Sequence, residues 1–389
     1  MKIILTILVA ILLTIVAIVL LVIFFKIIWV TGKTWRHSIP ENERKEILHR
    51  ANYLVTEIEK GPEHLIQRMP DSIGEQFKGE WTIYSLSMTA KALANIANLF
   101  PDKRNFALEH IGKIIDITLS STIRHYDKMR WGEDPLDGIQ GEKSHISYHS
   151  ILAWMIGCYK QIGGNDKYDH LYHSLCKAMN KKINWSPVLN LPTYPKEPVY
   201  VPDMMVAIVA LADYSRLYNG MYMPTVNKWI LKAKQEWLDP ETGLLASTLS
   251  PHSGEILSSP RGSFSALNCY YLSLIDPKFA KKQYECLKKL FAQNGLLTGI
   301  KEYYDRACMY GFDVDAGPII FNLSPSGTAF AIGAATCFKD KKFRKKLLRT
   351  AEIAGFTTTW RGKSHYLLAN IAFVGEAVAL AMRTSSATE

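Results

Sequence analysis

Proline and glycine are scarce in this chain, with 17 and 24 of 389 residues, and charged residues make up only 21%. Hydrophobic residues supply 48% and aromatic residues 11%. This composition excludes collagen-like and intrinsically disordered classes, and the chain is long enough to bury a substantial core. We therefore expect a folded protein.

Cysteine motifs and metal-ligand spacings are also absent. The six cysteines show no C-x-x-C spacing, which argues against a zinc or thioredoxin-type site, and most lie in apolar helical segments that suit buried free thiols. The sequence contains neither H-E-x-x-H nor an EF-hand loop. These absences predict a metal-independent site without a cofactor.

One long uncharged run lies near the N-terminus. Ile3–Phe25 contains 23 residues without a charge, and at about 1.5 Å per residue it spans roughly 34 Å, enough to cross a bilayer. It exceeds the usual apolar region of a signal peptide, and no A-x-A-like cleavage site follows. We predict a single-pass anchor through residues 3–25, with residues 1–37 as anchor and juxtamembrane segment and residues 38–389 as one domain.

The expected location is a bacterial-type inner membrane, but the sequence does not determine on which side of the membrane the domain lies. Several basic residues follow the run, at positions 26, 33, 36, 44 and 45, whereas only Lys2 precedes it. The positive-inside rule therefore favours a cytoplasmic domain. A very short N-terminal flank is equally typical of bacterial anchors whose amino terminus stays inside.

The formal net charge of +10 is concentrated in two places. Residues 1–37 hold four basic residues and no acid, which leaves 42 basic against 36 acidic residues. Residues 339–349 (KDKKFRKKLLR) contain seven basic residues and one acid, so the rest of the domain is neutral. No nucleic-acid partner is expected, because such binders spread Lys and Arg over a face. The basic segment is either a solvated helix face or a contact with anionic lipid headgroups.

Apolar residues recur at helical spacing almost throughout residues 38–389. A first helix is predicted to begin at Pro40 and to run through Ile58, and strands are expected to be few and short. The other helices are predicted near 80–99, 104–125, 145–163, 166–183, 203–219, 224–237, 262–274, 277–293, 325–337, 340–354 and 365–383.

Twelve helices joined as hairpins predict an all-α fold, an (α/α)6 toroid or barrel, preceded by one transmembrane helix. Six outer and six inner helices would then surround a central funnel. A solenoid of helix pairs would show a repeat of fixed period, and none is visible. The longer loops would line the mouth of the funnel, where chemistry is expected.

Four acidic residues in these loops are the predicted catalytic groups: Asp203, Glu302, Asp313 and Asp315. Asp203 precedes an apolar helix, and as its N-cap it would have a lowered pKa because of the helix dipole. Asp313 and Asp315 lie two apart in an expected extended segment, so they would share a face and one would stay protonated. The alternative is that these aspartates cap local amides or pair with Arg261 or Arg306.

Other residues in or near these loops are predicted to bind substrate. The aromatic rings could stack on a sugar or line a pocket for a hydrocarbon, and each could equally belong to the core. His145 and His149 would share one helix face and could be ordinary buried histidines. The predicted binding residues are Trp131, Glu133, His149, Tyr200, Arg261, Tyr303 and Tyr304.

From about Trp131 to Gly355 the chain resembles the linalool dehydratase-isomerase family, an (α/α)6-barrel group related in architecture to six-hairpin glycosidases and sugar epimerases. The similar stretches are Met155–Tyr159, Tyr214–Gly220, Trp237–Gly243, His252–Gly254 and Asp276–Ala280. The family enzyme uses a pair of cysteines, with an acid, a histidine and a tyrosine, on a terpene alcohol. Here Asp203 falls where one of those cysteines would be, and His149 lies near, but not on, the family histidine position. The resemblance therefore implies the fold and not the terpene reaction.

These residues favour a membrane-anchored enzyme that cleaves or rearranges a C–O bond by carboxylate acid/base catalysis, on a glycan or glycolipid. A hydro-lyase or isomerase acting on a lipid-like alcohol is the first alternative. A non-catalytic barrel that binds a small molecule is the second. A homo-oligomer is compatible with the sequence.

Overall fold

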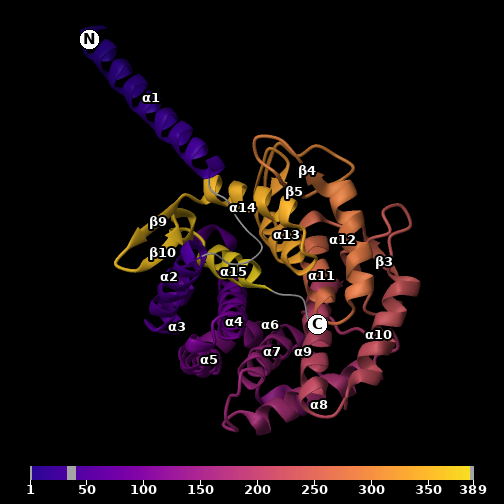
Figure 1. The fold of residues 1–389 in the computed structure, drawn as a ribbon. Coiled ribbons are helices and arrows are strands. Elements are labelled where there is room, and N and C mark those ends of the chain that lie inside the picture. Colours follow the sequence, from indigo (N-terminus) through magenta and orange to yellow (C-terminus); the bar gives the residue numbers. More distant parts are fainter. Residues whose placement is uncertain (1, 33–40, 386–389) are drawn as a thin grey trace.

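The computed structural model describes residues 2–32 and 41–385 (Figure 1). Within these ranges the chain forms fifteen α-helices, four short 3-10 helices and ten short strands. The α-helices are α1 (Lys2–Gly32), α2 (Glu41–Ile58), α3 (Pro62–Gln67), α4 (Glu75–Leu99), α5 (Arg104–Thr118), α6 (Ser121–Trp131), α7 (Ile146–Gln161), α8 (Asp169–Trp185), α9 (Val201–Leu217), α10 (Met223–Glu236), α11 (Gly262–Ser273), α12 (Pro277–Phe291), α13 (Pro325–Cys337), α14 (Lys341–Gly355) and α15 (Phe373–Thr384).

The strands and 3-10 helices lie in the connections between these helices. The strands are β1 (Val199–Tyr200), β2 (Thr248–Leu249), β3 (Ile256–Ser258), β4 (Ala292–Gln293), β5 (Gly299–Lys301), β6 (Tyr310–Asp313), β7 (Gly317–Ile320), β8 (Leu323–Ser324), β9 (Thr357–Trp360) and β10 (Lys363–Tyr366). The 3-10 helices are η1 (Asp71–Ile73), η2 (Pro101–Lys103), η3 (Asp137–Gln140) and η4 (Leu367–Asn370).

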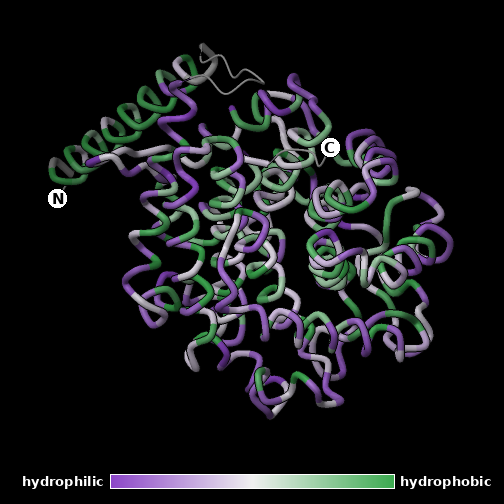
Figure 2. Tube along the Cα trace, turned by 60° about the horizontal axis from the view of Figure 1, so that its bottom comes forward, coloured by the Kyte–Doolittle hydropathy of each residue, from purple (hydrophilic) through white to green (hydrophobic). Residues whose placement is uncertain are grey.

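Six inner helices form a closed ring. Helices α4, α7, α9, α11, α13 and α15 contact one another in this order, and α15 returns to contact α4. An outer helix packs against each inner one: α5 on α4, α8 on α7, α10 on α9, α12 on α11, α14 on α13 and α2 on α15. Figure 2 shows the helices arranged around a common centre. The predicted (α/α)6 barrel is therefore confirmed.

The inner and outer layers differ in their sequence patterns because they differ in burial. Every residue of the inner helix α11 is buried, and its sequence contains no charged residue. The outer helix α12 buries one face, which includes Phe279, Tyr284 and Leu287, and carries lysines on the other. A helix enclosed on all sides is expected to lack a polar stripe, whereas an outer helix needs one.

Outer and inner helices alternate along the chain, so the inner helices run in one direction and their N-terminal ends meet at one end of the barrel. The strands lie in the connections that lead into these ends. β1 precedes α9, β2 and β3 precede α11, β4 to β8 precede α13, and β9 and β10 precede α15. They pair as antiparallel sheets in the orders β1-β2-β3, β4-β5-β8-β7-β6 and β10-β9. This end, which we call the mouth, carries the longest connections.

Two predicted helices differ from the observed ones. The predicted helix 104–125 is broken between α5 and α6, where Ser120 caps α6 by accepting a hydrogen bond from the backbone of Ile123. The predicted helix 365–383 begins too early, because residues 363–366 form β10 and α15 begins only at Phe373. Arg361 and Gly362, both at positive φ, form the two-residue turn of the β9–β10 hairpin. The predicted start at Pro40 lies outside the described residues.

A buried ionic network joins the beginning of the ring to its end. Arg50 of α2 lies 2.6 Å from Glu376 of α15 and 3.4 Å from Glu352 of α14. Beside it, Glu43 of α2 pairs with Arg344 at 2.9 Å and with Arg383 at 3.4 Å. These contacts tie α2 to the two last helices, where the ring closes.

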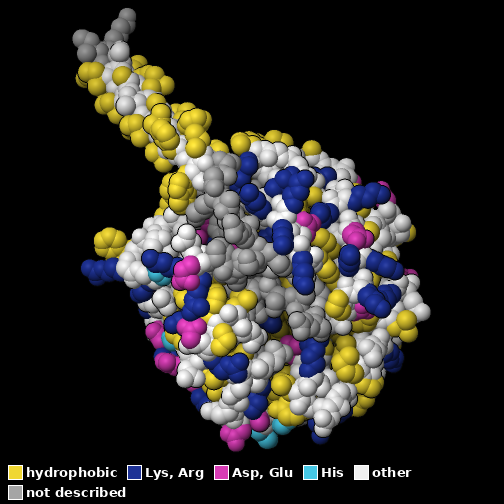
Figure 3. Space-filling model, in the orientation of Figure 1, with side chains coloured by type: hydrophobic (Ala, Val, Ile, Leu, Met, Phe, Trp, Pro, Cys, Tyr) yellow, Lys and Arg dark blue, Asp and Glu magenta, His cyan; other side chains and the backbone are white. Residues whose placement is uncertain are grey.

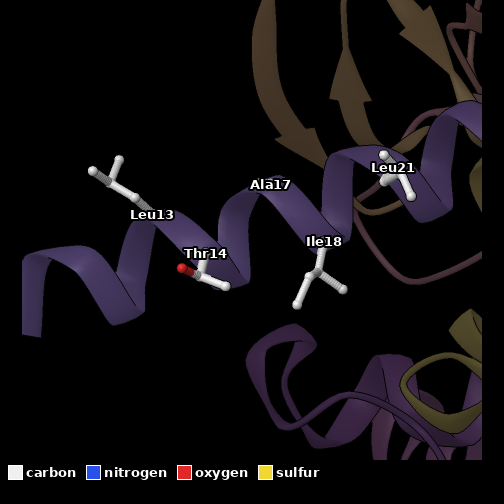
Figure 4. A pocket seen from close by; sticks show the side chains of 5 residues that line it. All are labelled: Leu13, Thr14, Ala17, Ile18 and Leu21. Carbon is white, nitrogen blue, oxygen red and sulfur yellow. The ribbon is translucent and has the colours of Figure 1, made fainter.

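Helix α1 leaves the barrel (Figure 1), and its side chains from Ile4 to Phe25 are exposed. Its segment Ile4–Trp29 is, among the described residues, the one helix long and apolar enough to cross a membrane. A signal sequence near an N-terminus would have the same length and composition, so the retained anchor stays a prediction. Figure 4 shows the shallow apolar groove on α1 that Leu13, Thr14, Ala17, Ile18 and Leu21 line.

Candidate active site

Asp203 lies in the first turn of α9, at the mouth, but it does not cap the helix. Tyr200 occupies the N-cap position, and no side chain caps this helix end. The carboxylate of Asp203 instead accepts a hydrogen bond from the Thr193 hydroxyl at 2.8 Å. Burial raises its pKa to about 6, and the charge of Glu197 adds to this, against the lowering effect of Thr193. The predicted N-cap role and lowered pKa of Asp203 are therefore wrong.

Arg261 organises three of the predicted acids. Glu302 is fully buried and accepts hydrogen bonds from Arg261 Nε at 2.7 Å and from the backbone N–H and hydroxyl of Ser263 at 3.1 and 2.9 Å. Arg261 also donates to Asp313 and lies 3.5 Å from Asp315. Asp313 further accepts hydrogen bonds from the backbone N–H groups of Asp315 and Ala316 at 2.9 and 3.0 Å. Glu302 and Asp313 thus hold Arg261 and a turn in place, which is the alternative that the sequence left open.

Asp315 differs from its neighbour Asp313. It lies in the turn between β6 and β7, not in an extended segment, so the predicted alternation of the two side chains is wrong. Its side chain is 44% exposed, yet the surrounding protein disfavours the ionised form and raises its pKa to about 7. Arg261 opposes this rise, and the charges of Asp313 and Asp203 reinforce it. The pair therefore contains one carboxyl that holds its proton near neutral pH.

Glu80 is a site residue that the sequence interpretation missed. It lies in the second turn of α4, and burial together with the charges of Asp203 and Asp315 raises its pKa to about 8. The Tyr194 hydroxyl bonds to the carboxyl, and Arg130 is near enough to lower its pKa in part. Its Oε2 atom is buried and has no hydrogen-bond partner among the described residues. The sequence feature that could have identified Glu80 is an acidic residue at the start of a long apolar helix.

Tyr200 lies near all three of these carboxyl groups. Tyr200 interacts electrostatically with Asp315, Asp203 and Glu80, and burial is the main cause that raises its pKa to about 12. Its ring packs edge-on against Phe264 at 6.2 Å, and the Arg261 guanidinium lies 4.9 Å from the same Phe264 ring. Tyr200 and Arg261 thus lie beside the acids, and their predicted role in substrate binding stays a prediction.

Tyr84 extends the site toward the barrel interior. It follows Glu80 by one helical turn, and its hydroxyl is 3.3 Å from that of Tyr271 on α11. The charges of Asp203 and Asp315 contribute to its raised pKa, after burial. Together with Glu80 it gives the inner end of the site two polar groups on one face of α4.

Three predicted binding residues gather elsewhere, at the connection between α6 and α7. His149 is buried, and its Nε2 is 2.7 Å from the carbonyl oxygen of Pro135. Burial lowers the pKa of His149 to about 3. Glu133 bonds to His145 at 3.1 Å, and Trp131 packs 5.4 Å from the His145 ring. His149 is thus the buried histidine that the sequence offered as its alternative.

Tyr303 and Tyr304 make contacts away from the three carboxyl groups. The Tyr304 hydroxyl donates to Glu241 at 2.8 Å, and its ring packs against Phe291. The Tyr303 ring lies 3.9 Å from the Arg306 guanidinium. The contacts of these two tyrosines therefore do not involve Glu80, Asp203 or Asp315.

The thiols occupy positions that suit packing. Cys158, Cys176, Cys269 and Cys337 are buried, and burial raises the pKa of each thiol, to about 12 for Cys158. Such thiols are weak nucleophiles. Among the described residues no group of three His, Cys, Asp or Glu side chains could hold a metal ion. The metal-independent reaction stays a prediction.

No protein-family model matches this chain. The crystal structure of an unsaturated glucuronyl hydrolase specific for heparin is similar in fold, with a TM-score of 0.55, 12% identity, and coverage of 87% of this chain and 96% of that one. An inactive variant of the alpha-1,6-mannanase GH76A of Salegentibacter sp. HEL1_6, in complex with alpha-1,6-mannotetrose, has a TM-score of 0.51 and 11% identity, with coverage of 87% and 98%.

Both similarities concern architecture alone at this level of identity. The mannanase variant carries alanine in place of two consecutive aspartates, and our chain contains no two consecutive aspartates. Neither structure is described as a linalool dehydratase-isomerase, so that resemblance stays a prediction. The chain therefore has the (α/α)6 fold of six-hairpin glycosidase-like proteins, with its own set of acids at the mouth.

Proposed function

We propose that this protein is a glycosidase-like enzyme that cleaves a C–O bond by acid/base catalysis, with Glu80 as the acid and Asp203 as the base. The observation that carries the proposal is the order of the pKa values of two mutually interacting carboxyl groups. Near pH 7, Glu80 with a pKa of about 8 is mainly protonated, and Asp203 with a pKa of about 6 is mainly ionised. Two carboxyl groups in opposite protonation states are what general acid/base cleavage requires.

In the proposed reaction Glu80 donates its proton to the oxygen of the glycosidic bond as the bond to the anomeric carbon breaks. Asp203 accepts a proton from the water whose oxygen attacks that carbon. One water is consumed, and the products are a sugar with a free anomeric hydroxyl and an alcohol. The Oε2 atom of Glu80 is buried without a hydrogen-bond partner among the described residues, and a buried polar atom without a partner is uncommon where a side chain has only a structural role. This assignment replaces Asp313 and Glu302, which we propose act as positioning residues for Arg261.

The aromatic groups suggest how a sugar would be held. Tyr200 and Phe264 offer flat faces beside the carboxyl groups, and Tyr84 and Tyr194 offer hydroxyls. This combination of apolar rings and a few polar groups is typical of ligand sites. We propose a glycan or glycolipid substrate and a membrane anchor in α1. The buried thiols argue against a terpene-type reaction that uses cysteines. The unpartnered carboxyl oxygen of Glu80 argues against a barrel with a purely structural role.

Activity of the purified full-length protein on aryl glycosides tests the proposal. The panel should include mannosides and unsaturated uronosides, the sugar classes named for the two solved neighbours. Glu80→Gln and Asp203→Asn should each lower kcat about 10²–10⁴-fold, as expected for a lost acid or base. Glu133→Gln is the matched control, because Glu133 bonds to His145 outside the site. Near-normal rates in both site variants would refute the assignment.

A further inference from the structure

The barrel carries an exposed apolar surface beside α1, which we call the rim. It comprises the tip of the β9–β10 hairpin and the turn η4, both at the mouth end. Its large apolar side chains are highly exposed, at 73% for Trp360, 46% for Leu367, 51% for Leu368 and 63% for Ile371. In Figure 1 the β9–β10 hairpin projects from the barrel near the foot of α1. Four such side chains close together in the chain are unusual on a surface that meets only water.

Helix α1 fixes where the rim lies relative to a membrane. Ile18, Val19, Val22 and Ile23 of α1 line one groove with Phe356, Leu367 and Leu368 of the barrel. A helical span needs about 20 residues, and the uncharged run begins only at Ile3. A span of this length that begins at Ile3 ends near Val22, so it includes Ile18, Val19 and Val22. The barrel residues in the same groove then lie at membrane depth.

The charges around the rim agree with a lipid neighbour. Residues 353–375 contain no Asp or Glu, and they contain Arg361 and Lys363. The acids at either end of this stretch, Glu352 and Glu376, are buried against Arg50. Trp360 at the hairpin tip, with the Arg361 guanidinium 5.6 Å from its ring, is a residue pair suited to the headgroup layer. Figure 3 shows hydrophobic side chains along α1 and at its foot, with Lys and Arg side chains nearby.

We propose that the rim inserts into the same bilayer leaflet that α1 enters, so that the protein contacts the membrane through its barrel as well as through its anchor. Leu367, Leu368 and Ile371 enter the apolar layer, and Trp360 and Arg361 lie among the headgroups. This inference rests on the proposed anchor. It does not depend on the proposed catalytic residues.

Spin-label accessibility in the full-length protein tests this inference. The partly exposed Cys286 and Cys308 are first changed to Ser, and the label is placed by Leu368→Cys in vesicles of phosphatidylcholine and phosphatidylglycerol. Collisions with oxygen should exceed collisions with a water-soluble nickel chelate. Met221→Cys is the matched control, because Met221 is 58% exposed in the turn between α9 and α10. A label there should collide mainly with the chelate.

A third label, at Leu12→Cys in α1, separates the two possible failures. If the Leu12 label is in lipid and the Leu368 label reports water as Met221 does, the rim does not insert, although the anchor does. If the Leu12 label also reports water, both the anchor and the rim insertion are refuted. Lipid-like accessibility at both Leu12 and Leu368 supports the inference.

Discussion

Three carboxyl groups at the mouth have pKa values raised above their ordinary range, mainly by burial. The pKa values of Asp203, Asp315 and Glu80 are about 6, 7 and 8. Below pH 6 the proposed base Asp203 becomes protonated, and above pH 8 the proposed acid Glu80 becomes ionised. We expect a bell-shaped pH profile of kcat/KM with limbs near these two values. Measurement from pH 4 to pH 10 checks it, and a profile with one limb would contradict the pair.

The raised pKa of Glu80 also has a consequence for stability. Between the ordinary value of 4.5 and about 8 the folded protein keeps a proton that the unfolded chain has lost. The folded state binds more protons in this window, so the free energy of unfolding falls as pH rises through it. Glu80→Gln removes this penalty, and it should raise Tm relative to the wild type, most clearly above pH 8. Glu133→Gln serves as the control, and we expect no rise in Tm for this variant. If the Tm of Glu80→Gln at pH 9 is equal to or lower than that of the wild type, the pKa of Glu80 is not raised as proposed.

Sequence patterns found part of the site because some of its residues stand in polar loops between helices. Asp203, Tyr200, Arg261 and Asp315 were identifiable in this way. Glu80 escaped because it lies inside a helix, where an acid normally faces solvent. The roles of Glu302 and Asp313 depend on hydrogen bonds to Arg261, which residue spacing does not report.

At the scale of elements, α2 is held to the last helices by the Arg50 network. Arg50 is 1% exposed and bonds to Glu376, Glu352, Glu46 and Thr357. Arg50→Ala leaves buried carboxylates without their cation, so it should lower the free energy of unfolding by about 3–5 kcal/mol. Urea denaturation in detergent measures this. Lys113→Ala, which removes the exposed ion pairs with Glu59 and Glu109, should leave the midpoint nearly unchanged.

The positions of the helices could be predicted from apolar periodicity, whereas the positions of the strands could not. A segment without charged residues, such as α11, still identifies a buried inner helix once its neighbours are known to alternate with it. The strands have two to four residues each, too few for a period of two to stand out. The predicted helix over 365–383 was therefore extended across β10 and η4, whose apolar residues fit either pattern.

At the scale of the whole molecule, α1 and the barrel are chemically distinct. The ring of helices closes without any contribution from α1, which contacts the barrel mainly at α14. We expect that deletion of residues 1–37 leaves a folded, mainly helical domain. After the membranes are washed, high-speed centrifugation should leave this domain in the supernatant. Circular dichroism and fractionation check this. Loss of helical signal in the truncated protein would instead assign α1 a structural role.

The strand-bearing connections lie at the same end of the barrel as Glu80 and Asp203, and that end also carries the rim. Contact of the rim with a leaflet therefore brings the proposed catalytic groups to the membrane surface. An encounter with a lipid-linked substrate then becomes a search in two dimensions. Rates would follow the number of substrate molecules per unit area of membrane, and dilution of the vesicles in buffer would leave the turnover of each enzyme unchanged.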